Sequence, residues 1–526
     1  MRRQQIWIFL VWTMVGVVSA CAQDVDWDAY QGRVITNVTV VSTEVFDPKT
    51  PGEDLRILGW ANALHIVTRE GVIRRELLFA EGEPLDPLLV QETERNLRRL
   101  GIFQDASIRP EDGPDGLTLR IRTADRWATK LITDLSSEGS ITSLRLGLEN
   151  TNFLGRAKRF GGTVEASSDV DALNLFLLDP RVLGSRWSLS AGYFKTDLAE
   201  GQRLGISYPF FSESSRWGGA YSHNGSSGDR RVFYSGGDAD SLHVDERRNE
   251  GFVARQFGGT ILQRVALSAS QQRLSGDVLQ HRATVAVSYA LMQRHHRALR
   301  RVDLFGVSED IAAGWTVQVL AGMDMQALGA DVDRPAWRID GSVSWFVGRG
   351  GFFGLQTRHH GFSQNGSLQN SRTVSEAWGF WKTKRQTLAW SLGGAIYEEE
   401  QPYVRMAFGG DTRLRGYPAR HQTGTRSLWL NVEERLFTPM RVFFLHVGAA
   451  VFLDVAQAWD APQSATWRSF DFGTGGGIRI GNNKSGSGAV RLDAAYGRDG
   501  WGFSLASASF VRVARGLVFP STSLFR

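Results

Sequence analysis

Cysteine is nearly absent from this chain of 526 residues, because Cys21 is the only one. A fold held together by internal disulfide bonds is therefore excluded. After residue 22 the chain also lacks any apolar run near the ~20 residues that a membrane-spanning helix requires. The sequence motifs GxSxG, HExxH and the Gly-Lys-Ser/Thr loop are missing as well. We therefore expect no catalytic residues, no cofactor and no metal site, and hence no enzyme.

Glycine and aromatic residues are abundant instead. The chain has 58 Gly and 17 Trp, and aromatic residues make up 11% of it, while only 14 residues are Pro. This composition is typical of a β-rich, folded protein rather than a disordered one. The formal net charge of +5 is small for this length, and no long basic run indicates nucleic acid as a partner.

The first 22 residues have the pattern of a signal peptide. Arg2 and Arg3 precede an apolar core at residues 6–18, and small residues follow it. Two processing routes are open: cleavage before Gln23 at an A-x-A motif, or lipidation of Cys21 within the lipoprotein-box motif VSAC. We favour plain cleavage. A secreted β-rich chain without helical spans is either a periplasmic or extracellular β protein or an outer-membrane barrel.

Residues 33–125 have the pattern of a small α/β domain with the order β-α-α-β-β. Asp86 before Pro87 is a good N-cap and first-turn pair, and Gly101 ends the helix that follows. In residues 117–123, apolar and polar side chains alternate as in a strand with one buried face. The expected elements are a strand at 34–42, a loop or partly helical insertion at 43–65, a helix within 68–86, a helix from Pro87 to Gly101, and strands at 103–110 and 117–123.

This domain resembles a POTRA domain. The resemblance lies in GVIRRELLFAEGEPLDPLLVQETERNLRRLGIFQDASI, residues 71–108, which contain a first helix, a Gly-acidic-x-Leu break, a second helix and the following strand. It implies a periplasmic module that docks extended polypeptides on the edge of its sheet, where backbone hydrogen bonds supply affinity without demanding a sequence. The sequence shows one such module. A generic small α/β domain is the alternative.

From Trp127 to residue 510 the chain consists of segments of about ten residues with period-two alternation. In residues 442–459, apolar side chains such as Leu445 and Val451 alternate with small or polar ones such as Gly448 and Asp454. Such alternation suits strands with lipid on one side and a wet lumen on the other. At roughly 24 residues for each strand with its connection, this region predicts an antiparallel transmembrane barrel of ~16 strands.

Several barrel segments resemble the BamA/TamA superfamily of outer-membrane assembly factors. LRLGLENTNFLGRAKRFGG, residues 144–162, looks like its second-strand signature, and residues 178–190 and 208–217 look like its early strand-turn motifs. The last predicted strand, residues 500–510, resembles an outer-membrane β-signal. Such signals usually end a chain, whereas a C-terminal extension at 511–526 follows here and either extends the closing strand or folds back. The residues that carry the β-signal are Gly502, Phe503, Leu505 and Phe510.

The stretch FGGDTRLRGYPARHQTG, residues 408–424, interrupts the alternation with arginines and glycines. Its LRGY resembles the [VL]-RG-[FY] motif in the sixth outer loop of that superfamily. Two strand motifs follow in the expected order. VFLDVAQAW, residues 451–459, resembles F-x-D-x-G with Ala456 in place of the usual Gly, and GTGGGIRI, residues 473–480, resembles G-x-G-x-R.

We expect this loop to enter the barrel lumen. Strand parity turns Asp454 and Arg479 inward. Gly416 would allow a sharp turn, Arg415 would pair with Asp454, and Tyr417 would contribute a flat ring and a hydroxyl. The apolar neighbours that parity turns toward lipid are Leu453, Val455, Ile478 and Ile480. The alternative is a solvated outer loop whose arginines bind lipopolysaccharide.

The resemblance implies a mainly β outer-membrane protein of the surface-antigen type, with its POTRA domain in the periplasm. It would help insert, assemble or translocate polypeptides by POTRA strand capture and by a lateral seam between the first and last barrel strands. Expected partners are unfolded outer-membrane or secreted polypeptides and outer-membrane lipids, with accessory lipoproteins an open case. The alternative function is a specialised pore, lipid-handling protein or surface antigen without insertase activity.

Overall fold

The computed structural model describes residues 25–46, 56–114, 116–138, 141–168, 170–233, 239–401, 403–410, 412–443, 445–481, 490–498, 500–506 and 510–511. The signal peptide expected at residues 1–22, with Cys21, lies outside the described residues. The same is true of residues 512–526 in the expected C-terminal extension.

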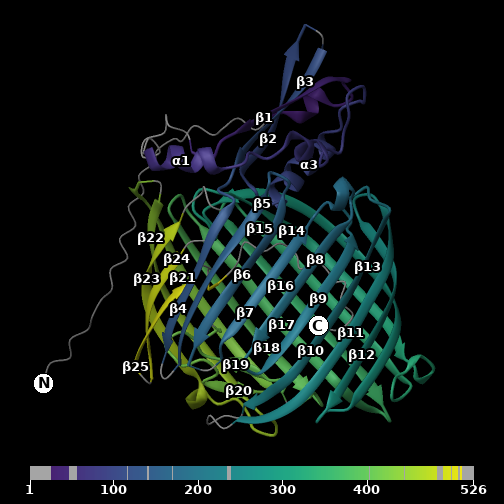
Figure 1. The fold of residues 1–526 in the computed structure, drawn as a ribbon, viewed down its shortest axis with the longest axis vertical. Helices are drawn as coiled ribbons and strands as arrows, with labels where there is room; N and C mark the ends of the chain where they lie inside the picture. The colour runs from purple at the N-terminus through teal and green to yellow at the C-terminus, as the bar shows by residue number, and fades with distance from the viewer. Residues whose placement is uncertain are drawn as a thin grey trace, which may run out of the picture.

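An N-terminal module, residues 27–125, stands on one end of a large barrel (Figure 1). Its three strands form a sheet in the order β1-β3-β2, in which β1 runs parallel and β2 antiparallel to β3. The elements of the module are η1 Trp27–Tyr30, β1 Ile35–Thr43, α1 Arg56–Leu64, α2 Glu70–Arg74, α3 Pro87–Arg99, β2 Phe103–Gly113 and β3 Gly116–Asp125.

The module folds around an apolar core between its sheet and helix α3. The carboxylate of Asp86 accepts a hydrogen bond of 2.8 Å from the Leu88 amide, and Pro87 occupies the first turn, so the predicted helix start is confirmed. The helix expected within residues 68–86 is much shorter, because Phe79 and Leu85 bury their side chains in the core from non-helical backbone. An additional helix, α1, occupies part of the expected insertion.

The barrel is closed by twenty antiparallel strands within the described residues, so the prediction of ~16 is wrong. Tight connections explain the difference: β8 ends at Thr196 and β9 begins at Ala199. The barrel strands are β4 Thr129–Glu138, β5 Ile141–Phe153, β6 Lys158–Ser167, β7 Ala172–Asp179, β8 Ser188–Thr196, β9 Ala199–Tyr208, β10 Trp217–Phe233, β11 Ala239–Gly258, β12 Leu262–Gly276, β13 Gln280–Arg300, β14 Ser308–Asp324, β15 Arg334–Val347, β16 Gly351–Gln364, β17 Ser367–Lys382, β18 Gln386–Glu398, β21 Arg426–Val442, β22 Leu445–Trp459, β23 Asp471–Gly481, β24 Val490–Gly497 and β25 Gly500–Ala506.

Short elements lie in the connections between these strands. A two-stranded sheet joins β19 Met406–Phe408 to β20 Gln422–Gly424. Three single turns of 3₁₀ helix are η2 Val182–Gly184, η3 Gln326–Leu328 and η4 Trp467–Ser469. Within the described part of the chain, no helix combines the length and the apolar character needed to cross a membrane.

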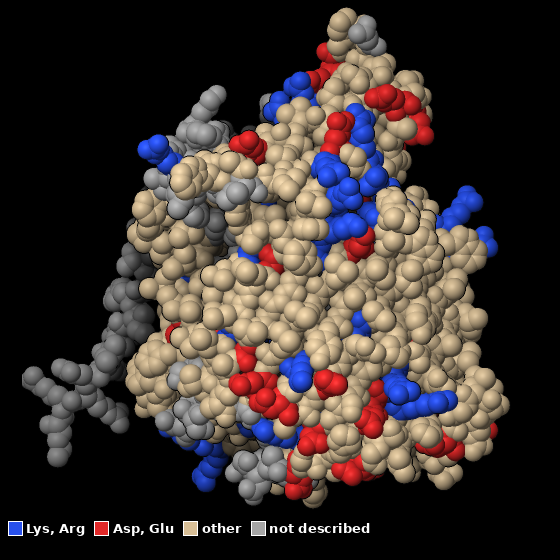
Figure 2. Space-filling model, in the orientation of Figure 1, with Lys and Arg blue, Asp and Glu red and all other residues tan. Residues whose placement is uncertain are grey.

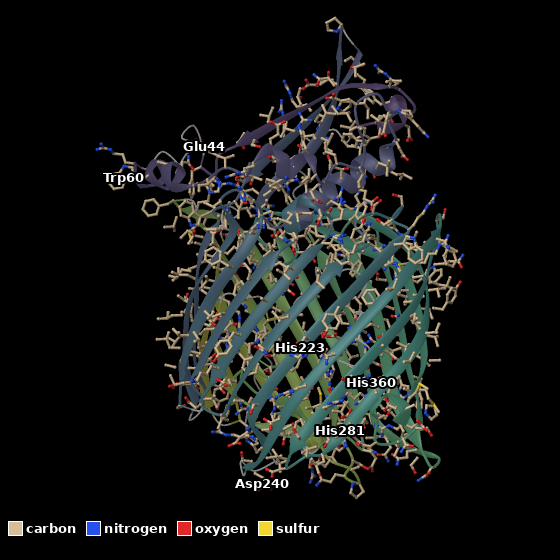
Figure 3. The ribbon with its side chains drawn as sticks, turned by 45° about the vertical axis from the view of Figure 1, so that its right-hand side comes forward. Glu44, Trp60, His223, Asp240, His281 and His360 are labelled. Carbon is tan, nitrogen blue, oxygen red and sulfur yellow. The ribbon has the colours of Figure 1, made fainter. Side chains whose placement is uncertain are left out.

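The outer surface of the barrel carries a belt of apolar side chains. Leu131 is 67% exposed, and Val253 and Val451 are each 61% exposed. Figure 2 shows this middle zone almost free of charged residues, with charges above it on the module and below it at the opposite end. Asp240 marks that opposite end (Figure 3). A barrel with an apolar belt between two charged ends has the surface that a lipid bilayer requires.

The ladder that closes the barrel is short. Within the described residues, β25 pairs with β4 only along residues 503–505 and 135–137, whereas β4 pairs with β5 along its whole length. Within the described residues β25 covers Gly500–Ala506 of the expected closing strand at 500–510, and Phe510 lies outside it. Phe510 and Val511 turn into the lumen instead, so the start of the C-terminal extension folds back rather than lengthening the strand.

Candidate functional site in the barrel lumen

The segment between β18 and β21, residues 399–425, forms a lumenal loop. It leaves the barrel wall at the end opposite the N-terminal module and carries the small β19–β20 sheet (Figure 1). Apolar burial holds it inside, since Phe408, Leu414 and Tyr417 pack against Trp429 and Ala456 of the wall. The loop is therefore a packed part of the barrel interior.

Arg415 is completely buried and contacts three carboxylates, with Asp493 the most distant of them at 3.4 Å. Its Nε lies 2.7 Å from one oxygen of Asp454 and its Nη2 lies 3.0 Å from the other, so the guanidinium and this carboxylate form a paired contact. Its Nη1 donates a 2.9 Å hydrogen bond to Glu433. The guanidinium carbon also lies 3.4 Å from the ring centroid of Phe452, in cation–π contact.

Glu433 joins Arg415 to a wider set of charges, the lumenal network. One of its oxygens lies 2.8 Å from the Nε of Arg435 and the other lies 3.3 Å from Arg479. Arg479 also pairs with Asp493. The network comprises Arg415, Arg435, Arg479 and Arg491 with Asp303, Glu433, Asp454 and Asp493. Four cations therefore balance four anions, as low-dielectric surroundings require.

Two glycines bring the lumenal loop close to the wall. Gly416 has a φ of +86°, which favours glycine. A Cβ on Gly473 of β23 would collide with the carbonyl oxygen of Arg415, so only glycine leaves room there. Tyr417 then completes the contact, because its hydroxyl donates to the carbonyl of Phe472 at 3.1 Å and accepts from the amide of Arg498 at 2.9 Å.

Arg435 connects the lumenal network to two further segments. Its Nη1 lies 2.6 Å from Asp303 and 2.8 Å from the carbonyl of Val302, in the turn between β13 and β14. Its Nη2 donates to the carbonyl of Val511. The ring centroid of Phe510 lies 4.0 Å from the guanidinium carbon of Arg415. The lumenal loop, the turn between β13 and β14 and the C-terminal segment therefore all contact the lumenal network.

The structure brings together the loop residues that the sequence singled out. Arg415 contacts Asp454 directly, whereas Arg479 reaches Arg415 only through Glu433 and Asp493. Of the four side chains expected to face lipid, Leu453 and Ile478 are 41% and 49% exposed, and Val455 and Ile480 are half-buried.

The β-signal residues do not stay together. Gly502 is buried on the inward face of β25, while Phe503 is 59% exposed on the outer face. Leu505 pairs with Leu135 across the seam. Phe510 lies away from them in the lumen, so it is not part of the closing strand.

Sequence reasoning missed five of the eight residues of the lumenal network, namely Asp303, Glu433, Arg435, Arg491 and Asp493. Glu433 and Arg435 alternate with apolar residues in LWLNVEERLF, residues 428–437, and Arg491 and Asp493 do so in VRLDAAYG, residues 490–497. Charges at inward positions were therefore a visible signal. The partners on other strands were not visible, because the sequence does not show which strands lie side by side.

The N-terminal module is fastened to the barrel rim by paired charges. Arg98 of α3 lies 2.7 Å from Asp310 of β14, and Glu76 lies 2.6 Å from Arg181 after β7. Burial alone would lower the pKa of Arg98, but the hydrogen bonds and charge of Asp310 outweigh it and the pKa is raised. The module therefore has a defined seat over the mouth of the barrel.

No protein-family model and no curated protein matches the chain. Among solved structures it is similar to BamA from Haemophilus ducreyi lacking POTRA domains 1–3, with 12% identity over 90% of this chain and 84% of that one, at a TM-score of 0.36. CdiB from Escherichia coli shows 13% identity over 93% and 80%, at 0.45. CdiB from Acinetobacter baumannii shows 12% over 91% and 74%, at 0.42. Likeness at this level assigns no function to the chain.

Proposed function

We propose that this protein is an outer-membrane barrel of the BamA/TamA type. It helps polypeptides to insert into, assemble in or cross the outer membrane. Its N-terminal module is a single POTRA domain that lies in the periplasm. The observation that carries the proposal is the short seam between β25 and β4. Among the described residues few ladder hydrogen bonds hold the first and last strands together there, so this is the place where the wall would open at least cost.

The N-terminal module supplies the capture surface. Its sheet order leaves β1 and β2 at the two edges, and an edge strand presents N–H and C=O groups outside the ladder. Ile35 and Val38 of β1 and Ile108 of β2 already use theirs within the module, so a client would pair with other positions of these edges. An extended client strand can add to such an edge through backbone hydrogen bonds, whatever its side chains. The module lies over one end of the barrel (Figure 1), so a client on the edge of its sheet would be held near the barrel mouth.

The seam then serves as a template. With β25 and β4 parted, each strand offers a free edge at membrane depth, where an unpaired backbone group costs several kcal/mol. A client strand satisfies those groups by pairing with them. The energy for the reaction comes from client folding and from burial of apolar client side chains in lipid.

A disulfide across the seam tests this mechanism. Leu135 and Leu505 pair directly between β4 and β25. Because Cys21 is the only native cysteine, the double variant Leu135→Cys with Leu505→Cys can be oxidised cleanly in a Cys21→Ser chain. Reconstituted in liposomes, the reduced form should accelerate folding of an unfolded barrel client, and the oxidised form should lose that acceleration.

The matched control locks a neighbouring ladder. Leu135 also pairs with Leu144 of β5, so Leu135→Cys with Leu144→Cys places a disulfide next to the seam without closing it. This control should fold clients equally well when oxidised or reduced. Full activity of the oxidised Leu135–Leu505 variant would contradict the opening of the seam.

A second candidate function is conduction through the barrel. The lumenal network fills one side of the interior, but cavities of about 630 and 550 Å³ lie along the opposite wall, where β9, β10 and β11 contribute Gln202, Gly225, Ser226 and Glu246 to both. These volumes would suit a pore or a path for a secreted chain. Ion conductance in planar bilayers, without any acceleration of client folding, would favour this function.

A further inference from the structure

A cavity of about 530 Å³ lies under helix α3, between the N-terminal module and the lumenal face of the first barrel strands. The module contributes Arg99, the link between β3 and β4 contributes Arg126, and β4 contributes Lys130. Phe210 and Phe211 supply apolar surface from the connection between β9 and β10. The proposed mechanism assigns no role to this chamber.

The carboxylates in the chamber are already paired. Glu76 lies 2.6 Å from Arg181, and Glu149 forms an ion pair with Arg159. In contrast, Arg99, Arg126 and Lys130 have no acidic group within ion-pair distance among the described residues. The chamber thus holds three positive charges without an ion-pair partner of their own among the described residues, although Glu149 also acts on Lys130 at longer range.

Arg126 is the most constrained of these cations. Its Nε is buried and finds no hydrogen-bond partner in the described part of the chain, while its backbone amide donates to the carbonyl of Ile102 at 2.8 Å. Burial lowers the pKa of Arg126 to about 10, so the guanidinium is still charged at neutral pH. A buried charge without a partner costs free energy, which an anionic ligand would recover.

A second cavity continues the chamber along α3. Its volume is about 280 Å³, and it shares Arg99 and both Phe210 and Phe211 with the first cavity. It adds Arg95, for which the described residues contain no ion-pair partner, and Arg264, whose guanidinium lies 4.0 Å from the ring centroid of Phe210. Figure 2 shows Lys and Arg gathered on the module down to the barrel rim.

We propose that this chamber binds the carboxylate side chains of an acidic, extended segment of a client polypeptide. The inference rests on the proposed function, because it names the chemistry of the client at the mouth of the barrel. Lys130 lies on the inward face of β4, whereas its neighbour Leu131 lies on the lipid-facing side at 67% exposure. Lys130 therefore faces the inside of the barrel and not the bilayer, which argues against a lipid phosphate.

Peptide binding to the purified full chain in detergent tests the proposal. The probe is a fluorescein-labelled peptide that alternates Asp with Ser, and its counterpart carries Asn in place of Asp. Fluorescence anisotropy should show binding of the Asp peptide, weakening with salt, and at least about tenfold weaker binding of the Asn peptide. The variants Arg126→Gln and Lys130→Gln should each weaken binding of the Asp peptide about tenfold.

The control is Arg468→Gln, because Arg468 is an exposed arginine in η4 of an outer loop. It should leave peptide affinity unchanged, and heat-modifiability on gels should show that every variant is folded. A photo-crosslinking Asp peptide should label the segments around Arg99 and Arg126. Labelling confined to the β2 edge, or equal affinity of the Asp and Asn peptides, would overturn the proposal.

A further arm separates the polypeptide from other anions. Inorganic phosphate and vesicles of phosphatidylglycerol are titrated as competitors. Phosphate should compete only at high concentration, and the vesicles should not compete. Tight phosphate or vesicle binding that Arg126→Gln abolishes, without binding of the Asp peptide, would overturn the polypeptide assignment. The seam disulfide tests the proposed function separately, since it closes β25–β4 and leaves the chamber intact.

Discussion

At the scale of single residues, the buried contacts of Arg415 fix the position of the lumenal loop inside the barrel. Moving a guanidinium and a carboxylate out of water is costly, so the pair with Asp454 adds little net stability relative to apolar packing. Removing only one partner is strongly destabilising, because the other is left as a buried charge that nothing neutralises. The pair of Arg415 and Asp454 therefore fixes the position of the lumenal loop and adds little to the free energy of unfolding of the barrel.

The substitution Arg415→Ala should destabilise the fold by about 3–5 kcal/mol, because Asp454 and Glu433 lose a cation that neutralises both. Urea-induced unfolding in detergent, followed by tryptophan fluorescence, measures the loss. The control Arg468→Ala removes an exposed arginine and should change the free energy of unfolding by less than about 0.5 kcal/mol. Equal stability of the two variants would show that Arg415 does not hold the loop.

The substitution Gly473→Ala should displace the lumenal loop, because the added Cβ would overlap the carbonyl oxygen of Arg415. Proteolysis of the loop in intact vesicles measures the displacement as faster cleavage. Gly341→Ala on β15 is the matched change, since its Cβ would meet only the methyl group of Thr357 at 3.7 Å. Unchanged cleavage of the Gly473 variant would mean that the loop does not depend on this close approach.

At the scale of elements, strand β25 and the segment after it have different roles: the strand closes the barrel, and the segment contacts the lumenal network. Within the described residues the strand runs to Ala506 and closes the barrel through a ladder of three residue pairs with β4. Phe510 and Val511 then contact the lumenal network through Arg415 and Arg435. The closing strand is thereby tied to the same buried charges that hold the lumenal loop, so a change at the seam can reach the loop.

We predict that Phe510→Ala loosens the lumenal loop without unfolding the barrel. The ring covers the guanidinium of Arg415 at 4.0 Å, and its loss exposes that charge to water. Single-channel recordings should show more frequent openings than in the unaltered protein. Trp467→Ala, an aromatic change at a position that is 89% exposed, should leave the recordings unchanged. Identical gating of the two variants would contradict the tie between the C-terminal segment and the loop.

At the scale of the whole molecule, the N-terminal module and the barrel behave as one seated assembly. The ion pairs Arg98–Asp310 and Glu76–Arg181 join distant parts of the chain across the rim. Helix α3 also donates from Asn96 to the carbonyl of Phe211 at 2.9 Å. These contacts hold the module over the lumen, so that α3 covers the cavity lined by Arg99, Arg126 and Lys130.

Exchanging the charges of one rim pair tests this seat. Arg98→Glu alone should loosen the module, because it faces Asp310 with a like charge. Hydrogen exchange of α3 should then rise, and Arg98→Glu combined with Asp310→Arg should bring it back toward the original rate. A double-mutant cycle of alanine variants should give a coupling of about 1.5–3 kcal/mol. No recovery in the exchanged pair would mean that the seat does not rest on this contact.

Short-range features could be predicted from the sequence. Asp86 and Pro87 define a helix start by local hydrogen bonding, and the alternation around Asp454 shows which side of a strand faces inward. The strand number was missed because strand count depends on how tightly each connection turns, as between Thr196 and Ala199. The alternation of apolar and polar residues does not show how short each connection is.

The sequence by itself determined a β-rich chain with an α/β module in front of it, an inward and an outward face on each strand, and an arginine loop suited to the lumen. Tertiary structure decided which charges pair, since Arg415, Glu433 and Asp493 come from three different segments, the lumenal loop, β21 and β24. It also decided that Phe510 leaves the closing strand for the lumen. Alternation and capping depend on neighbouring residues, whereas neutralising buried charge depends on which strands the closed barrel sets side by side.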